Sequence, residues 1–478
     1  MQNAFLIVSK NYTEKQAGVL FVVFGLSQFL FQTPAGYMMD YTNKKTAVLS
    51  AACIATSFLT ILTALTAQEE GGNIGFMIVI KFFQGVVTAF IPPGLNSITQ
   101  GIVGSVGMTK QVSRNEMMNH FGTAVIVLAG SLIAYFLYPD IGILFAVSAV
   151  ACLGVVFFLN MIRPQDIDHD AARGLIDTSK TDTDTICSTP TGYKPPVNDA
   201  DGESTEAKKS KSDAPSFNFG FGGRNTESFS STPHAETPLN VLRDPILLTF
   251  VVMCFLFHLA NASILPLVMQ TLAIGEGRSG ILMSGLCIIV SQTIMVGSAK
   301  LCGDYSTVYG RKPLFLVGLF SLSVRCLLLV ILLTLRDANG HSTVLQVCIL
   351  STQLLDGVGA GFFGTMYILV TSDISRGSGR FSMTLGITTA AMSIGGTVSG
   401  YLGQALAEDK GYREAFGILG FIGLVPALLY LFCIPETFSA EELGGNRNTM
   451  TGIAEENEEN HDDKSEDQQN DYKSMEMI

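Results

Sequence analysis

Two short polar turns, each set between apolar runs, decide how this chain is interpreted. The first reads GYMMDYTNKK, from Gly36 to Lys45, and the second reads GDYSTVYGRK, from Gly303 to Lys312. Each turn carries a carboxylate followed by a basic pair. Such short polar connections between long hydrophobic segments are typical of helices that cross a bilayer and return.

Composition supports a membrane location. Hydrophobic residues make up 48% of the 478 residues, charged residues make up 15%, and the mean hydropathy is +0.38. The net charge of −12 arises in two polar segments, because residues 163–244 hold 14 acidic and 9 basic side chains and residues 436–478 hold 13 and 3. The remainder is slightly basic, which is too little for nucleic-acid binding.

Hydropathy predicts eleven full membrane spans, since about 20 apolar residues cross the hydrocarbon core. The segment MQNAFLIV at the start is apolar but shorter than a span. The predicted spans cover residues 17–39, 47–67, 75–98, 117–138, 141–162, 245–268, 280–302, 313–335, 344–370, 383–406 and 413–434.

An internal repeat organises these spans. Residues 3–28 align with residues 261–292 through an Asn-Ala start and a Ser-Gln pair, and KFFQG at Lys81 aligns with QLLDG at Gln353. The offset stays near 260 to 272 residues, which predicts two related halves of six helices. More helix precedes Asn261 than Asn3, so we expect the first helix to be truncated.

The repeat predicts four parts: an N-terminal bundle (1–162), a disordered central loop (163–242), a C-terminal bundle (243–435) and a disordered acidic tail (436–478). Loops on the side of the quoted turn hold eight Lys or Arg residues, against six on the other side. This difference places the quoted turn, the loop and the tail in the cytoplasm. The prediction is an all-α, multi-pass integral membrane protein.

The turns resemble the cytoplasmic motif of the major facilitator superfamily, in which Gly and Asp precede a Gly-Arg-Lys group. The resemblance covers nearly all of the chain outside the loop and tail. It implies two pseudo-symmetric six-helix bundles around a solute pathway. The matching residues are Gly36, Asp40, Lys44, Lys45, Asp304, Gly310, Arg311 and Lys312.

A carboxylate at the end of a span can accept hydrogen bonds from the N-terminal amides of a neighbouring helix, where the helix dipole is positive. We therefore expect Asp40 and Asp304 to act as latches that hold the cytoplasmic side closed. The alternative is that these turns serve only to orient the chain in the membrane.

Polar side chains within spans are costly in lipid and indicate a solute or proton pathway. Arg325 and Asp356 lie at similar depth and are expected to form a buried pair, although Asp356 could instead carry a proton. Lys81 could take part in transport or reach to the outer interface. The predicted pathway residues are Asn3, Gln28, Gln32, Lys81, Gln84, His258, Asn261, Gln292, Arg325 and Asp356.

The function expected is secondary transport of a small organic solute by alternating access, with coupling to protons left open. The alternative is a receptor built on a transporter scaffold that binds a ligand without flux. The segment IPETF, from Ile434 to Phe438, resembles the Pro-Glu-Thr of sugar porters. No HExxH, GxSxG or CxxC motif occurs, and the GxGxxG match at residues 359–364 lies inside a predicted span, where close helix packing explains it. We expect a monomer that is not an enzyme, has no cofactor, and has as partners a solute, lipids and, if transport is coupled to them, protons.

Overall fold

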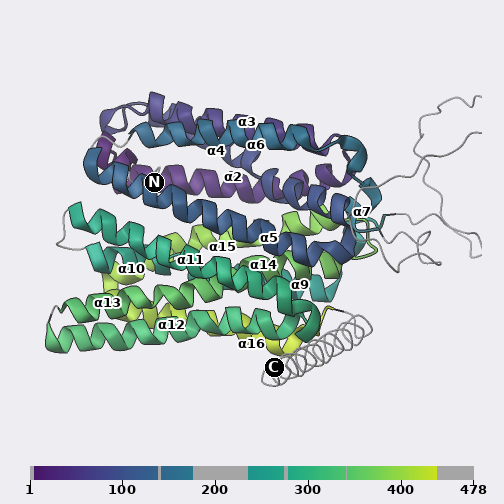
Figure 1. The fold of residues 1–478 in the computed structure, drawn as a ribbon. Coiled ribbons are helices and arrows are strands. Elements are labelled where there is room, and N and C mark those ends of the chain that lie inside the picture. Colours follow the sequence, from purple (N-terminus) through teal and green to yellow (C-terminus); the bar gives the residue numbers. More distant parts are fainter. Residues whose placement is uncertain (1–4, 138–141, 176–234, 274–277, 341, 439–478) are drawn as a thin grey trace, which may run out of the picture. The chain divides into compact units, whose positions relative to one another are not determined.

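The computed structural model describes residues 5–137, 142–175, 235–273, 278–340 and 342–438 (Figure 1). The regular secondary structure in these ranges is helical. Ten helical segments are long and apolar enough to cross a membrane, and one of them, Ile74–Leu137, contains two predicted spans. The predicted all-α membrane fold is confirmed. Asn3, residues 176–234 and the acidic tail from residue 439 lie outside the described residues.

The N-terminal half begins with a capping box. Thr13 Oγ1 accepts a hydrogen bond from the Gln16 amide, and Gln16 Oε1 accepts one from the Thr13 amide, so two of the amides at this helix start are satisfied by side chains. The elements of this half are η1 (Phe5–Ser9), α2 (Glu14–Tyr41), α3 (Lys45–Thr66), η2 (Glu69–Gly71), α4 (Ile74–Thr88), α5 (Ile91–Leu137), η3 (Gly142–Phe145) and α6 (Ala146–Met161).

In the C-terminal half the predicted span 245–268 is broken. Pro266 lacks the amide hydrogen that would bond to the Ala262 carbonyl, and the helix is interrupted one turn before this proline. The elements of this half are α9 (Pro245–Asn261), α10 (Ile264–Ala273), α11 (Arg278–Tyr309), α12 (Arg311–Asn339), α13 (Thr343–Ser351), α14 (Gln353–Ser375), α15 (Phe381–Lys410) and α16 (Tyr412–Cys433).

Helix α5 consists of two arms that meet at Gly104. The backbone there has φ 66° and ψ 179°, a conformation that is essentially restricted to glycine. The second arm starts about ten residues before residue 117, where the sequence predicts the span 117–138 to begin. Lys110 and Arg114, counted as loop residues in the sequence, therefore lie in the helix.

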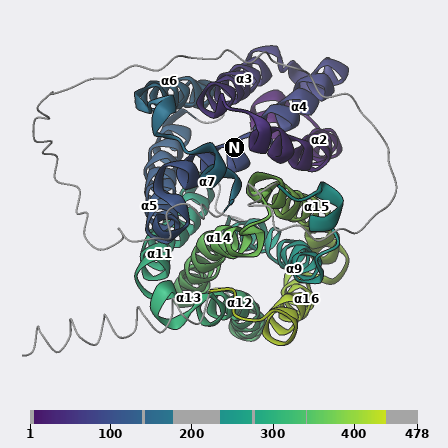
Figure 2. The same ribbon diagram turned by 90° about the vertical axis from the view of Figure 1, so that its right-hand side faces the viewer.

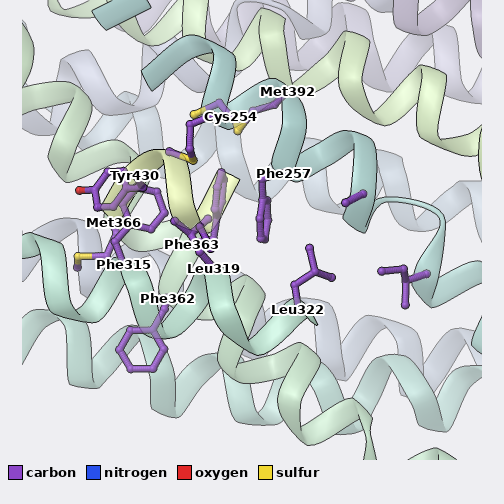
Figure 3. Close-up of a cluster of buried hydrophobic side chains, with 14 of the residues drawn as sticks. Cys254, Phe257, Phe315, Leu319, Leu322, Phe362, Phe363, Met366, Met392 and Tyr430 are labelled. Atoms are coloured by element: carbon purple, nitrogen blue, oxygen red, sulfur yellow. The ribbon is translucent and has the colours of Figure 1, made fainter. Parts of the chain in front are cut away.

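Aromatic packing fills the interior of the C-terminal half (Figure 3). The rings of Phe257 and Phe363 are stacked with centroids 4.1 Å apart and planes 5° apart, and Phe315 packs edge-on against Tyr430. Lipid tails are as apolar as these side chains, so close van der Waals packing holds the helices together.

The repeat predicted from the sequence has a structural counterpart. Gly85 of α4 lies against Ser27 of α2, and Gly357 of α14 lies against the Ser291 carbonyl of α11. A Cβ at either glycine would overlap its neighbour, so each pair of helices can approach closely only because glycine is present. These two contacts are related by the same offset as the aligned sequences.

The two halves meet along two helix pairs, α2 with α15 and α5 with α11 (Figures 1 and 2). Gly36 lies against the Ser382 backbone, and a Cβ on Gly386 would lie 2.5 Å from the Gln32 carbonyl oxygen. Because glycine occupies both positions, the α2 and α15 backbones can pack directly against each other.

Both ends of the predicted central loop are folded, so the boundaries 163–242 are too wide. Helix α7 (His169–Arg173) is capped by Asp168, whose carboxylate accepts hydrogen bonds from the amides of residues 170 and 171. The short helix α8 (Pro238–Val241) precedes α9. Ala172 is buried beside Gly101 of α5, which explains why this polar segment begins with ordered structure.

Candidate functional site

The carboxylate of Asp40 caps a helix in the other half. Its Oδ1 accepts a hydrogen bond from the Ser382 amide and its Oδ2 accepts one from the Met383 amide, both at 2.9 Å. These amides belong to the first turn of α15, where the helix dipole is positive. Asp40 is 1% exposed, so solvent competes little for either bond.

The two lysines of the first turn differ. Lys45 is buried and donates a hydrogen bond from Nζ to the Met39 carbonyl at the end of α2. Lys44 is exposed. A buried ammonium group on a helix C-terminus satisfies a free carbonyl and also interacts favourably with the helix dipole.

The second turn does not reproduce this arrangement. Asp304 is exposed and makes no hydrogen bond or ion pair within the described residues. Asp40 follows Gly36 by four residues and shares its helix face, whereas Asp304 follows Gly303 directly and is rotated by about 100°. Gly303 faces Ser113 of α5, so the carboxylate of Asp304 points elsewhere. Asp40 is therefore placed as the predicted latch would be, whereas Asp304 is not, and the expectation for Asp304 is corrected.

Arg311 makes the contact between halves at the second turn. Its guanidinium donates to Asp373 Oδ2 at 3.1 Å, to Ser306 Oγ at 2.7 Å and to Thr109 Oγ1 of α5 at 2.8 Å. The first two partners are in the C-terminal half and Thr109 is in the N-terminal half. A cation therefore bridges the halves where an aspartate was expected to do so.

The segment IPETF caps helix α12. Glu436 Oε1 accepts a hydrogen bond from the Arg311 amide at 2.8 Å, and Oε2 accepts one from the Lys312 amide at 3.0 Å. Lys312 Nζ donates to the Ile434 carbonyl at 2.7 Å, while Gly310 has φ 91° beside the Glu436 carboxylate. The sequence indicated only a family resemblance for Glu436, because its partners lie more than 120 residues away.

Arg325 of α12 and Asp356 of α14 form an ion pair, and their side chains are 1% and 7% exposed. Asp356 Oδ2 also accepts from Ser291 Oγ at 2.6 Å, and Arg325 donates to Gln353 Oε1 at 2.9 Å. All four residues are in the C-terminal half. This geometry favours the structural alternative, since every partner joins helices of the same half.

Lys81 and Gln84 occupy the corresponding place in the N-terminal half. Lys81 Nζ donates to Gln84 Oε1, and Gln84 Nε2 donates to Thr60 Oγ1 of α3, both at 2.8 Å. Lys81 is 4% exposed, so its ammonium group does not extend to the membrane surface. Thr60, Lys81 and Gln84 correspond, within the repeat offset, to Arg325, Gln353 and Asp356.

The remaining predicted pathway residues are distributed over several helices. His258 Nδ1 lies 3.3 Å from the Cys254 carbonyl, and its ring packs edge-on against Phe363. Gln32 Oε1 accepts from Ser393 Oγ at 3.2 Å, whereas Gln28 and Asn261 are half-buried. The structure does not bring these four residues together into one cluster.

Gln292 identifies a polar cluster that the sequence interpretation missed. Gln292 Oε1 lies 2.8 Å from His120 Nδ1 of α5, and His120 Nε2 lies 3.7 Å from Glu116 Oε2. Asn119 Nδ2 donates to the same Glu116 oxygen at 3.4 Å. The predicted start at residue 117 excluded Glu116. The available signal was the repetition of polar residues four apart, Asn115 with Asn119 and Glu116 with His120, which places them on one helix face.

A pocket of about 340 Å³ lies between α2, α9 and α15. None of the predicted pathway residues lines it, and its wall is apolar apart from the Thr33 hydroxyl. The lining residues are Phe29, Thr33, Val251, Val252, Phe255, Ile387, Ala390, Ala391 and Ile394. Within the described ranges, no group of three His, Cys, Asp or Glu residues is arranged to hold a metal ion.

Comparison with known proteins gives a consistent result. The model of the Major Facilitator Superfamily matches residues 2–375 and 301–452. An uncharacterized MFS-type transporter found in two strains of Mycobacterium tuberculosis is 29% identical over 452 residues, which is 94% of this chain and 91% of that protein. The multidrug resistance protein fnx1 of Schizosaccharomyces pombe is 29% identical over 156 residues, 31% of this chain and 26% of its own length.

Two solved structures share the fold. The proton:xylose symporter XylE has a TM-score of 0.62 and 14% identity, with 93% of this chain and 92% of the other covered. The human organic anion transporter MFSD10 has a TM-score of 0.54 and 14% identity, with 90% and 88% covered. At this identity the similarity concerns the arrangement of helices alone.

Proposed function

Since the chain belongs to the Major Facilitator Superfamily, a family of integral membrane transporters, we propose that it moves a small organic solute across the membrane by alternating access. Transport is driven in this proposal by a proton gradient. The contact of Asp40 with the first turn of α15 carries the proposal, because it joins the two halves on the side assigned to the cytoplasm.

The chemistry of this contact suits a reversible closure. Hydrogen bonds to a charged group contribute about 1.5–3 kcal/mol each, so two of them hold the halves together without fixing them permanently. Arg311 adds a second crossing contact through Thr109. When the halves separate on this side, water can replace both sets of partners, and a pathway to the cytoplasm opens.

The names of similar proteins suggest which solutes to test. XylE carries xylose with protons, MFSD10 carries organic anions, and fnx1 is a multidrug resistance protein. We would reconstitute the full chain in lipid vesicles and measure uptake of labelled pentoses, organic anions and lipophilic organic cations, with and without an imposed proton gradient. Protein-free vesicles and addition of a protonophore are the controls.

We expect at least one solute to accumulate in a gradient-dependent manner and to leak out when the protonophore is added. A solute that shifts the thermal unfolding midpoint of the protein but never accumulates would support the receptor alternative. Accumulation that the protonophore does not reduce would contradict proton coupling but would still support the proposal that the protein is a transporter.

A further inference from the structure

Glu116 and His120 lie on α5 at the boundary between the two halves. The neighbouring helices α11 and α14 belong to the other half, and α5 packs along both. Glu116 Oε2 would be 3.9 Å from a Cβ added to Gly364 of α14, and His120 contacts Gln292 of α11. A change in the relative position of the halves must therefore change the surroundings of both side chains.

The orientation of Gln292 determines which nitrogen of His120 carries a hydrogen. With the Gln292 carboxamide oxygen 2.8 Å from Nδ1, His120 Nδ1 is the donor, because a carboxamide oxygen only accepts hydrogen bonds. His120 Nε2 is then the nitrogen that faces Glu116 Oε2, and it has no hydrogen-bond partner among the described residues.

This arrangement favours a proton between the two groups. A neutral imidazole would direct the lone pair of Nε2 at the carboxylate oxygen, and the two electron-rich atoms would repel each other. One added proton removes the repulsion, either as a carboxyl O–H directed at nitrogen or as an imidazolium N–H directed at a carboxylate.

The groups that surround Glu116 and His120 in the described part of the chain do not supply a compensating positive charge. Asn119 donates to Glu116 from α5, Gln292 faces His120 from α11, and Gly364 of α14 lies beside Glu116. Within the described part of the chain, neither lysine nor arginine forms an ion pair with Glu116.

We propose that Glu116 and His120 form the binding site for the transported proton, and that proton binding is linked to movement of the halves through the His120–Gln292 contact. This inference rests on the proposed transport function. A proton from water forms the O–H or N–H bond on entry, and that bond breaks on release to water at the other side, so no other reactant is needed.

Proton binding can be measured without knowing the solute. Infrared difference spectra of the full-length protein in lipid, recorded as the pH is lowered, detect the carbonyl stretch of a carboxyl group that becomes protonated. They also detect the shifted carboxylate stretch of a group whose neighbouring imidazole becomes protonated. We expect a band in the wild type that is absent in Glu116→Gln and retained at a shifted frequency in Glu116→Asp. In His120→Gln the proton affinity of the site should change by at least about tenfold, because the imidazole that shares the proton with Glu116 has been removed.

The control is Glu414→Gln on α16, since Glu414 is exposed and pairs with Arg413. This variant should retain the band. Size-exclusion profiles identify any variant that fails to fold, and Glu116→Asp preserves the carboxyl group if Glu116→Gln does not fold. Identical wild-type and Glu116→Gln spectra at every pH would overturn the proposal.

The infrared result and the transport experiment can fail independently of each other. A Glu116-dependent band without solute flux would support the proton site and count against the proposed transport function. Where flux occurs, Glu116→Gln should retain exchange of labelled for unlabelled solute but lose the response to the proton gradient. Gradient-driven uptake that is unchanged in Glu116→Gln would exclude this site as the coupling site.

Discussion

At the scale of the residue, the position of a carboxylate relative to its glycine decides what it can contact. Asp40 lies one helical turn after Gly36, so the close approach of α2 and α15 brings it to two free amides. Asp304 follows Gly303 directly and remains exposed. A similar sequence pattern therefore produces a closed contact in one copy and a solvated carboxylate in the other.

Asp40→Asn should weaken this contact, because the amide keeps only one acceptor oxygen and has no negative charge. The loss of about 2 kcal/mol would change the ratio of closed to open forms by about thirtyfold. Hydrogen–deuterium exchange of the Ser382 and Met383 amides should become faster. Asp304→Asn is the matched control and should leave these amides unchanged. Equal exchange in both variants would show that Asp40 does not hold α15.

The Arg325–Asp356 pair allows a second test at this scale. Asp356→Asn or Arg325→Gln alone leaves a buried group without its partner and should lower the free energy of unfolding by about 3–5 kcal/mol. The double variant should lose less than the sum of the two. Thermal unfolding in one detergent provides the comparison.

The exposed pair formed by Arg413 and Glu414 is the control for this cycle, since its side chains are 45% and 52% exposed. Its disruption should cost about 0–1 kcal/mol. If the effects of the two buried substitutions simply add, the two groups do not interact energetically, and Asp356 becomes a candidate for an independent protonatable group.

At the scale of the element, helix α7 connects the central segment to both halves. The Gly174 carbonyl accepts a hydrogen bond from the Gly377 amide at 2.7 Å, and Asp168 binds the Gly101 carbonyl of α5 through its amide at 2.9 Å. The other end of the segment binds the same turn of the C-terminal half, where Arg380 donates to the Glu236 carbonyl at 2.8 Å. Both ends of the central segment are thus bound to the turn between α14 and α15.

The binding of α7 should depend on pH through His169. Burial lowers the pKa of His169 below 6.5, and the nearby Lys45 and Arg173 cations lower it further, against a smaller opposing effect of Asp168 and Asp170. His169 therefore takes up a proton less readily when α7 is docked on the two halves than when α7 is released. The contribution of His169 to the docking of α7 is complete above pH 6.5 and is lost as the pH falls through the lowered pKa of His169.

Hydrogen exchange of the α7 amides, corrected for the intrinsic effect of pH, should become faster below pH 6.5. His169→Gln cannot titrate and should remove this dependence. A wild type whose α7 exchange is the same on both sides of 6.5 would contradict the linkage between His169 and docking.

At the scale of the whole molecule, the two halves share a geometry but not a charge distribution. Thr60, Gln84 and Lys81 in one half take the places of Arg325, Asp356 and Gln353 in the other. In the first half the cation, Lys81, is on α4 together with Gln84. In the second half the cation, Arg325, is on α12, whereas Gln353 is on the neighbouring helix α14. In the proton site proposed at Glu116 and His120, His120 contacts Gln292 across the boundary, a contact that only the assembled pair of halves provides.

The sequence by itself determined the membrane class, the approximate limits of the spans, the internal repeat and the family. These properties depend on hydropathy and spacing along one chain, which a local window can detect. The predicted limits failed mainly at α5, because Lys110, Arg114 and Glu116 made the start of that helix resemble a loop.

Only the tertiary structure decided which polar groups meet. The contacts Asp40 with α15, Arg311 with Thr109, Glu436 with α12 and His120 with Gln292 join residues far apart in the sequence. Each depends on the rotation and register of two packed helices, where a difference of one residue turns a side chain by about 100°. A single sequence specifies which helices form, but the packing of the halves determines which side chains face each other.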